Sequence, residues 1–97
     1  MLYTINKSPL MHGNLKSALR IAPDGAPILL YEDGVYAAVK GAASEELVTA
    51  ALESHPVYAL QADLTARGVS ELIEGVETVD YDGFVALVEE HPVVPWL

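Results

Sequence analysis

A nearly continuous apolar run, APILLY at residues 26–31, passes directly into the acidic, glycine-containing turn EDG at residues 32–34. A short strand without polar alternation has both of its faces covered, which is typical of a parallel sheet packed between helices. The glycine breaks the run, and residues 35–41 are predicted to form a short helix or turn. This stretch therefore predicts an open α/β fold, in which ligands bind where the strands end.

The rest of the chain alternates between short strands and helices without a repeat, a linker or a low-complexity segment. Strands separated by helices need crossover connections, so the sheet should be mainly parallel with helices on both faces. Pro92 and Pro95 argue against a central strand in the tail. We expect a single domain over residues 1–97, built on a small open sheet of four to five strands. Strands are predicted at residues 1–5, 26–31, 56–60 and 76–79, and helices at 15–22, 45–54, 62–68 and 81–91.

Several helix ends carry recognisable signals. Asn14 and Asp80 stand where N-caps are expected, and Ser44 opens the helix that follows it. Gly68 should terminate the helix over residues 62–68. Within that helix, Asp63 and Arg67 are four residues apart and can pair on its surface.

The composition restricts the classes of partner. The chain is 52% hydrophobic, which is high for a small domain and leaves room for an apolar surface that meets a partner chain. It carries 14 acidic and 5 basic residues, a net charge of -9, and the basic residues are scattered in the sequence. Direct binding of nucleic acid is therefore not expected, since the phosphate backbone requires clustered Lys and Arg. The acidic residues either form a solvated surface or dock on a basic partner.

Several kinds of chemistry are missing from the sequence. There is no cysteine, which excludes disulfides, thiolate catalysis and persulfide carriage by this chain. His12, His55 and His91 are far apart with no ligand spacing around them, and no phosphate-binding motif occurs, so neither a metal nor a cofactor is expected. No apolar run approaches the length of a membrane span, and MLYTINKSPL is too polar for a signal peptide. By default we expect a cytoplasmic protein.

The turn after the second strand holds one candidate for a ligand or partner site. Glu32 and Asp33 could do acid–base work at the carboxyl end of the strand, together with Gly34. The alternative is that Asp33 caps the following helix while Glu32 is solvated, and this alternative is favoured. Tyr31 and Tyr36 flank the turn and are candidates for packing or interface residues.

The tail PVVPWL gives the sharpest signal for an interaction. Its Trp96 and Leu97 either pack on the chain's own sheet or are buried against a neighbouring subunit. The sequence does not separate these alternatives.

Four blocks together resemble the TusB/DsrH family: ILLYEDGVYAAVKG, VYALQADLTARGV, VDYDGFVALVEEH and the terminal VPWL, with LYTINKSPL at the start. The resemblance implies a DsrE-like domain with a flavodoxin-like layout. It implies a subunit of a heterohexamer with paralogous TusC/TusD-like or DsrF/DsrE-like partners, which interacts with sulfur-carrier proteins. In the Tus branch, such complexes relay persulfide sulfur toward 2-thiouridine at the tRNA wobble position.

The resemblance also shows one departure. DsrH-type chains carry a cysteine on the first helix, and the matching position here is Ala18. An alanine cannot hold a persulfide, which favours the TusB type and a non-catalytic, assembling role. The reactive cysteine would then lie on a partner subunit. Two alternatives stay open: a DsrH-like subunit of a DsrEFH-type sulfur-oxidation complex, and a stand-alone small-ligand-binding protein that uses Glu32 and Asp33.

Overall fold

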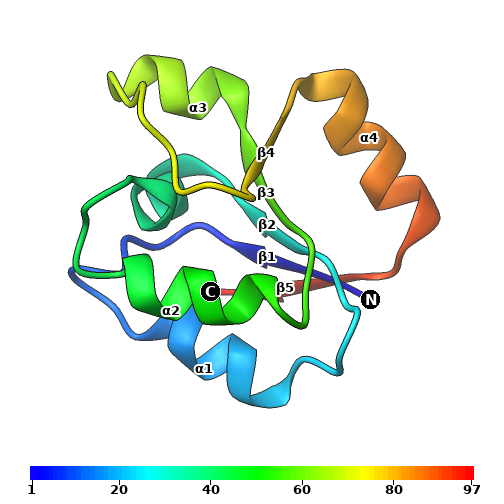
Figure 1. Ribbon diagram of the computed structural model, residues 1–97. Helices are drawn as coiled ribbons and strands as arrows, with labels where there is room; N and C mark the ends of the chain where they lie inside the picture. Colours follow the sequence, from blue (N-terminus) through cyan, green and yellow to red (C-terminus); the bar gives the residue numbers. More distant parts are fainter.

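The computed structural model describes residues 1–97 as one five-stranded sheet surrounded by helices (Figure 1). All four strand pairings are parallel, and the strand order is β4-β3-β2-β1-β5. This confirms the α/β class and the mainly parallel sheet that the sequence predicts. The strands are β1 (Leu2–Ile5), β2 (Ile28–Leu30), β3 (Val57–Leu60), β4 (Glu77–Val79) and β5 (Val93–Trp96).

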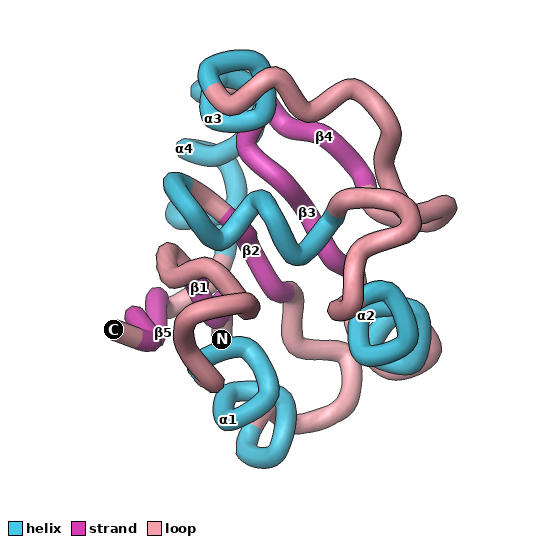
Figure 2. The backbone as a smooth tube through the Cα atoms, turned by 90° about the vertical axis from the view of Figure 1, so that its left-hand side faces the viewer, coloured by secondary structure: helices cyan, strands magenta, loops and turns pink.

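The strand order also decides which helix covers which face of the sheet. From β1 to β4 the chain steps in one direction, and from β4 to β5 it returns across the whole sheet. Because crossovers between parallel strands are right-handed, the returning helix α4 must lie on the face opposite α1 and α2. Figures 1 and 2 show this arrangement, with α4 on one side and α1 and α2 on the other. The helices are α1 (Asn14–Ile21), the 3-10 helix η1 (Glu32–Ala38), α2 (Glu45–Leu52), α3 (Gln61–Ala66) and α4 (Tyr81–Glu90).

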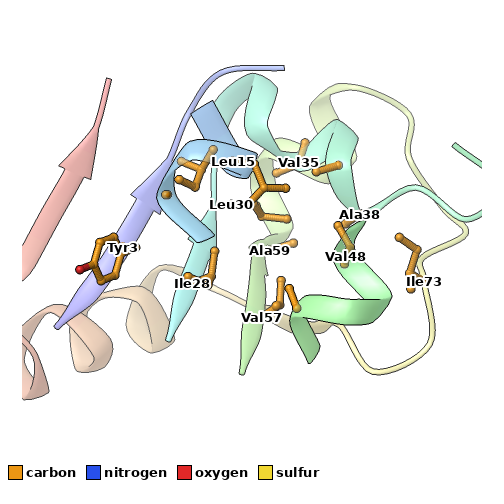
Figure 3. Packing of buried hydrophobic residues seen from close by; sticks show 14 of the residues in the cluster. Tyr3, Leu15, Ile28, Leu30, Val35, Ala38, Val48, Val57, Ala59 and Ile73 are labelled. Carbon is orange, nitrogen blue, oxygen red and sulfur yellow. The ribbon is translucent and has the colours of Figure 1, made fainter. Parts of the chain in front are cut away.

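The main core lies between the sheet and the layer formed by α1, η1 and α2. Alternate strand residues point into this layer because successive side chains of a strand face opposite sides. Figure 3 shows them packed against Leu15 of α1, Val35 and Ala38 of η1, and Val48 of α2. The strands contribute Tyr3, Ile5, Ile28, Leu30, Val57 and Ala59, all at most 3% exposed.

Two of the predicted helix ends are confirmed. Asp80 caps α4 as expected, since its Oδ1 accepts a hydrogen bond from the Gly83 N–H at 2.8 Å. Gly68 ends α3 at a φ of +68°, and the next N–H, of Val69, donates to the Leu64 carbonyl, which gives a Schellman-type end.

Asn14 was wrongly predicted to cap α1. Its side-chain amide donates instead to the carbonyl of Trp96 at 3.3 Å, and Gly13 occupies the capping position. Ser44 stands before α2 as expected, but its hydroxyl donates to the Ala37 carbonyl at 3.0 Å and does not cap the helix. In both cases the side chain donates to a backbone carbonyl outside the helix, and its oxygen accepts no hydrogen bond from the first N–H groups of the helix.

The tail forms the fifth strand, at the edge of the sheet beside β1. Proline is tolerated there because an edge strand leaves half of its backbone groups unpaired. Trp96 lies opposite Ile5, and its ring stacks in a tilted arrangement on Tyr3, with the ring centroids 6.1 Å apart. The tail is therefore a paired element of the sheet, and Trp96 packs on the chain's own sheet, which is one of the two alternatives that the sequence left open.

Candidate functional site

The turn between β2 and η1 is fixed by the end of β1. The N–H of Tyr31 donates to the Ile5 carbonyl at 3.1 Å, and the N–H of Gly34 donates back to the Tyr31 carbonyl at 2.9 Å. Gly34 is buried so close to β1 that a Cβ atom would overlap the Ile5 carbonyl oxygen. Glu32 has a φ of +48°, and no other residue apart from glycines has a positive φ. The turn thus requires glycine at position 34 for space, and it holds the backbone of Glu32 in a strained conformation.

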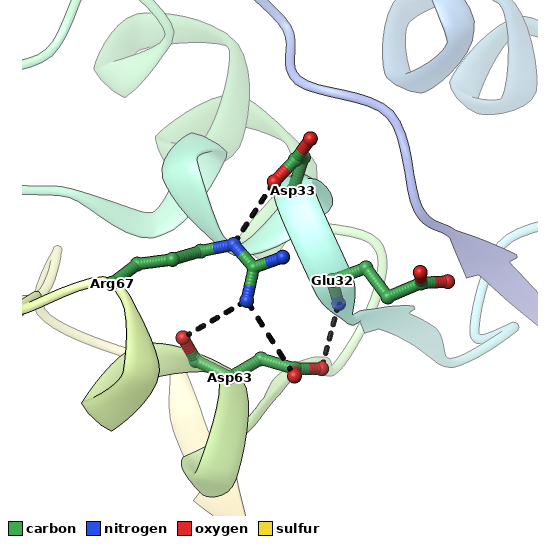
Figure 4. A network of polar contacts seen from close by, with 4 residues as sticks. All are labelled: Glu32, Asp33, Asp63 and Arg67. Carbon is green, nitrogen blue, oxygen red and sulfur yellow. Dashed lines mark hydrogen bonds and ion pairs between the residues drawn. The ribbon is translucent and has the colours of Figure 1, made fainter.

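Arg67 joins this turn to α3 (Figure 4). Its Nε donates to Asp33 Oδ1 at 3.0 Å, and its Nη1 lies 3.6 Å from Asp63 Oδ1 and donates to the Asp63 carbonyl at 3.4 Å. The other carboxylate oxygen of Asp63 accepts a hydrogen bond from the backbone N–H of Glu32 at 2.7 Å. One guanidinium and two carboxylates therefore hold the strained residue in place.

The hydrogen bond to Asp33 raises the pKa of Arg67 above its ordinary value, with further contributions from the charges of Asp33 and Asp63, while burial acts in the opposite direction. The sequence suggested that Asp33 caps η1, and this prediction is wrong. Tyr31 occupies the capping position, and the Asp33 carboxylate binds Arg67 instead. The Glu32 side chain is exposed and extends away from the network (Figure 4). The role of this arrangement is structural, because Arg67 pairs with both aspartates and thereby joins the turn to α3.

Three of the four candidate interface residues lie at the carboxyl ends of strands, and the fourth, Tyr36, lies within η1. Tyr31 and Tyr36 flank the turn after β2, and Trp96 and Leu97 end β5, with β1 between the two strands. Since the strands are parallel, their carboxyl ends all lie at the same end of the sheet. Leu97 is 77% exposed and Tyr36 36% exposed, whereas Trp96 is half-buried against Tyr3. Their role at an interface stays a prediction.

Ala18 lies on the sheet side of α1 and is completely buried in the core. His55 is buried as well, and its Nδ1 donates to the Ala26 carbonyl at 2.8 Å, so it is a core histidine with a satisfied hydrogen bond. No three His, Cys, Asp or Glu side chains gather in a way that could hold a metal ion. The longest helix, α4, has 10 residues, which is too few to span a bilayer.

The sequence did not reveal the bridge from Arg67 to Asp33, although it predicted the local pair with Asp63. The bridging residues are 34 positions apart, and no local pattern marks such a contact. The contact of Asn14 with the Trp96 carbonyl, across 82 positions, was hidden for the same reason.

Together these features define a class: a small doubly wound α/β domain whose strand ends carry a salt-bridged turn and no nucleophilic thiol. The family model described as DsrH like protein matches residues 7–94. Protein TusB of Serratia proteamaculans is 40% identical over 92 residues, covering 94% of each chain. Protein TusB of Pectobacterium parmentieri is 38% identical over 94 residues, covering 95% of each chain. The chain belongs to the DsrH-like family, among relatives named TusB.

Solved structures show the same fold at lower sequence identity. The ychN protein from Escherichia coli superposes with a TM-score of 0.83 at 19% identity, over 97% of this chain and 96% of that one. MTH1491 from Methanobacterium thermoautotrophicum gives a TM-score of 0.73 at 18% identity, over the same shares of the two chains. These likenesses show that the two proteins share the fold of this chain.

Proposed function

We propose that this chain is a non-catalytic subunit of a Tus-type sulfur relay complex, which passes persulfide sulfur toward 2-thiouridine at the tRNA wobble position. The observation that carries the proposal is the similarity to TusB proteins over almost the whole chain, in a sequence without cysteine. Persulfide transfer requires a thiolate as nucleophile. A member of this family without a thiol would therefore assemble and position the subunits that hold the sulfur.

We infer that its partners are paralogous TusC/TusD-like subunits, assembled with it as a heterohexamer that exchanges sulfur with carrier proteins. The high apolar content and the number of large apolar side chains left exposed support a partner surface. Four residues are proposed to contribute: Tyr31, Trp96 and Leu97 at the carboxyl ends of β2 and β5, and Tyr36 in the helix that follows β2. Leu97 is the most accessible of the four.

Two other functions have less support. A DsrH-like subunit of a sulfur-oxidation complex would be expected to carry the helix cysteine, and the chain has Ala18 there. A small-ligand site at the turn would need space beside Glu32 and Asp33, and neither residue lines any of the five surface cavities. The relay subunit is therefore the function that the observations favour.

The test is to co-express the tagged chain with its native paralogues and to supply a persulfide donor and a carrier protein. The paralogues should co-purify with the tag, sulfur should reach the carrier, and intact mass measurement should find no sulfur adduct on this chain. Complexes assembled without the chain should deliver less sulfur. A stable adduct on this chain, or undiminished delivery without it, would contradict the proposal.

A further inference from the structure

The outward face of α4 is an apolar stripe with an acidic border. Tyr81, Val85 and Val88 follow one another at helical spacing and are 61%, 50% and 38% exposed. Asp82 and Glu89 lie two turns apart beside this stripe, and no residue of α4 is buried. The helix therefore presents a face that the chain's own fold leaves uncovered.

The topology explains why α4 covers the central strands on this side but not the whole sheet. Three connections lie on the other face of the sheet, and α4 alone must cover five strands. A helix is about 10–12 Å wide, whereas strands are spaced about 4.8 Å apart, so one helix cannot extend over the whole sheet. Val93 of β5, which is paired with Leu2, is left 41% exposed on the α4 side.

The N-terminal quarter of the chain differs in charge from the rest. Residues 1–23 contain Lys7, Lys16 and Arg20 and no acidic residue, while residues 24–97 contain all 14 acids. None of these three basic residues forms an ion pair within the chain. Three of the five basic residues therefore lie in a segment without acidic neighbours in the sequence and are free of internal ion pairs.

The basic residues meet an apolar residue on the outward face of α1. Leu15 and Ala18 turn toward the core, so Lys16 and Arg20, four residues apart, lie on the solvent side. Ile21, the next residue, is 61% exposed. This face is therefore complementary to the α4 face in charge, since it presents two cations beside one exposed apolar side chain.

We propose that the α4 face of one copy of this chain docks onto the α1 face of a second copy. Pairing two α4 faces symmetrically would place Asp82 and Glu89 against acidic residues of the same helix, which like-charge repulsion disfavours. The α1 face supplies unpaired Lys16 and Arg20 instead. Because α1 and α4 lie on opposite sides of the sheet (Figures 1 and 2), the contact is heterologous and continues beyond a dimer. It stands independently of the sulfur relay.

The experiment compares two charge reversals by sedimentation equilibrium of the full-length chain over a range of concentrations. Arg20→Glu changes the α1 face, and Glu89→Lys changes the α4 face. Each should weaken self-association about tenfold or more, since each sets like charges against each other. Lys40→Glu and Glu53→Lys, at exposed positions outside α1 and α4, are the matched controls for net charge and should leave association within about twofold of the unmodified chain.

An equimolar mixture of the two reversed variants gives the decisive result. The new glutamate on α1 of one variant can then meet the new lysine on α4 of the other, and the remaining faces are unchanged. Association should therefore return to within about threefold of the unmodified level. Circular dichroism checks that each variant is folded. Lys16→Glu is a second variant of the α1 face and should weaken association as Arg20→Glu does. An unmodified chain that stays monomeric, a mixture that does not recover, or controls that weaken association equally would each overturn the proposal.

Discussion

Gly34 gives the sharpest test of the geometry at the β2–η1 turn. A methyl group added there would overlap the Ile5 carbonyl oxygen and lie close to the backbone of β1. A flexible side chain could move aside, but this carbonyl also accepts the hydrogen bond from the Tyr31 N–H. Relief therefore requires separating two neighbouring parallel strands at their carboxyl ends.

We expect Gly34→Ala to lower the free energy of unfolding by about 3 kcal/mol, the upper end of the usual cost of overpacking. For a domain of this size, that corresponds to a fall in melting temperature of about 12–24 °C. It would remove a large part of a total stability of about 5–15 kcal/mol.

The measurement is urea unfolding followed by circular dichroism and by the fluorescence of Trp96, the single tryptophan, which stacks on Tyr3 at the neighbouring strand. Gly13→Ala is the control, since a Cβ atom there meets nothing within 4 Å. Its cost should not exceed about 1 kcal/mol, the value of a typical N-cap change. If Gly34→Ala proves as mild as Gly13→Ala, the close approach of the turn to β1 is wrong.

Three further outcomes follow from the structure. Arg67→Gln should lower the free energy of unfolding by about 1 kcal/mol in thermal or urea melts, because it breaks partly exposed ion pairs, whereas Lys40→Gln should change it by less than about 0.5 kcal/mol. The pKa of Arg67 is raised in the folded state, so its contribution to the free energy of unfolding is fully present below the unfolded pKa and is lost only as the pH rises through the folded pKa. The difference in the free energy of unfolding between Arg67→Gln and the unmodified chain should therefore be constant from about pH 6 to pH 9. Asp80→Ala should cost about 1 kcal/mol through loss of the α4 cap, and equal stability would contradict the capping bond. Ala18→Cys should react with a thiol reagent about a hundredfold more slowly in the folded chain than in urea, because the position is completely buried, and fast reaction of the folded protein would refute that burial.

The burial of Ala18 bears on the comparison with DsrH-type chains. A cysteine at this position of this fold would lie under α1, in contact with the core and away from solvent. Replacing alanine by cysteine would therefore not by itself create an accessible sulfur carrier here. The proposed non-catalytic role is thus supported by the burial of position 18 as well as by the absence of a thiol.

The sequence by itself determined the elements whose signals are local. The apolar run before Gly34 identified β2, Asp80 identified the start of α4, and Gly68 identified the end of α3, because each signal acts within a few residues of the bond or turn that it forms. Parallel pairing also followed from the alternation of strands and helices. The resemblance of four separate blocks then gave the family.

Only the tertiary structure decided which distant groups meet. Asn14 and Asp33 both looked like helix caps, but Asn14 binds the Trp96 carbonyl and Asp33 binds Arg67. The tail became an edge strand because α4 returns it to the free side of β1, where Trp96 can stack on Tyr3. Local propensities are similar whether or not such a partner is present, so the order of strands in the sheet determines which contact forms and which helix face is left uncovered.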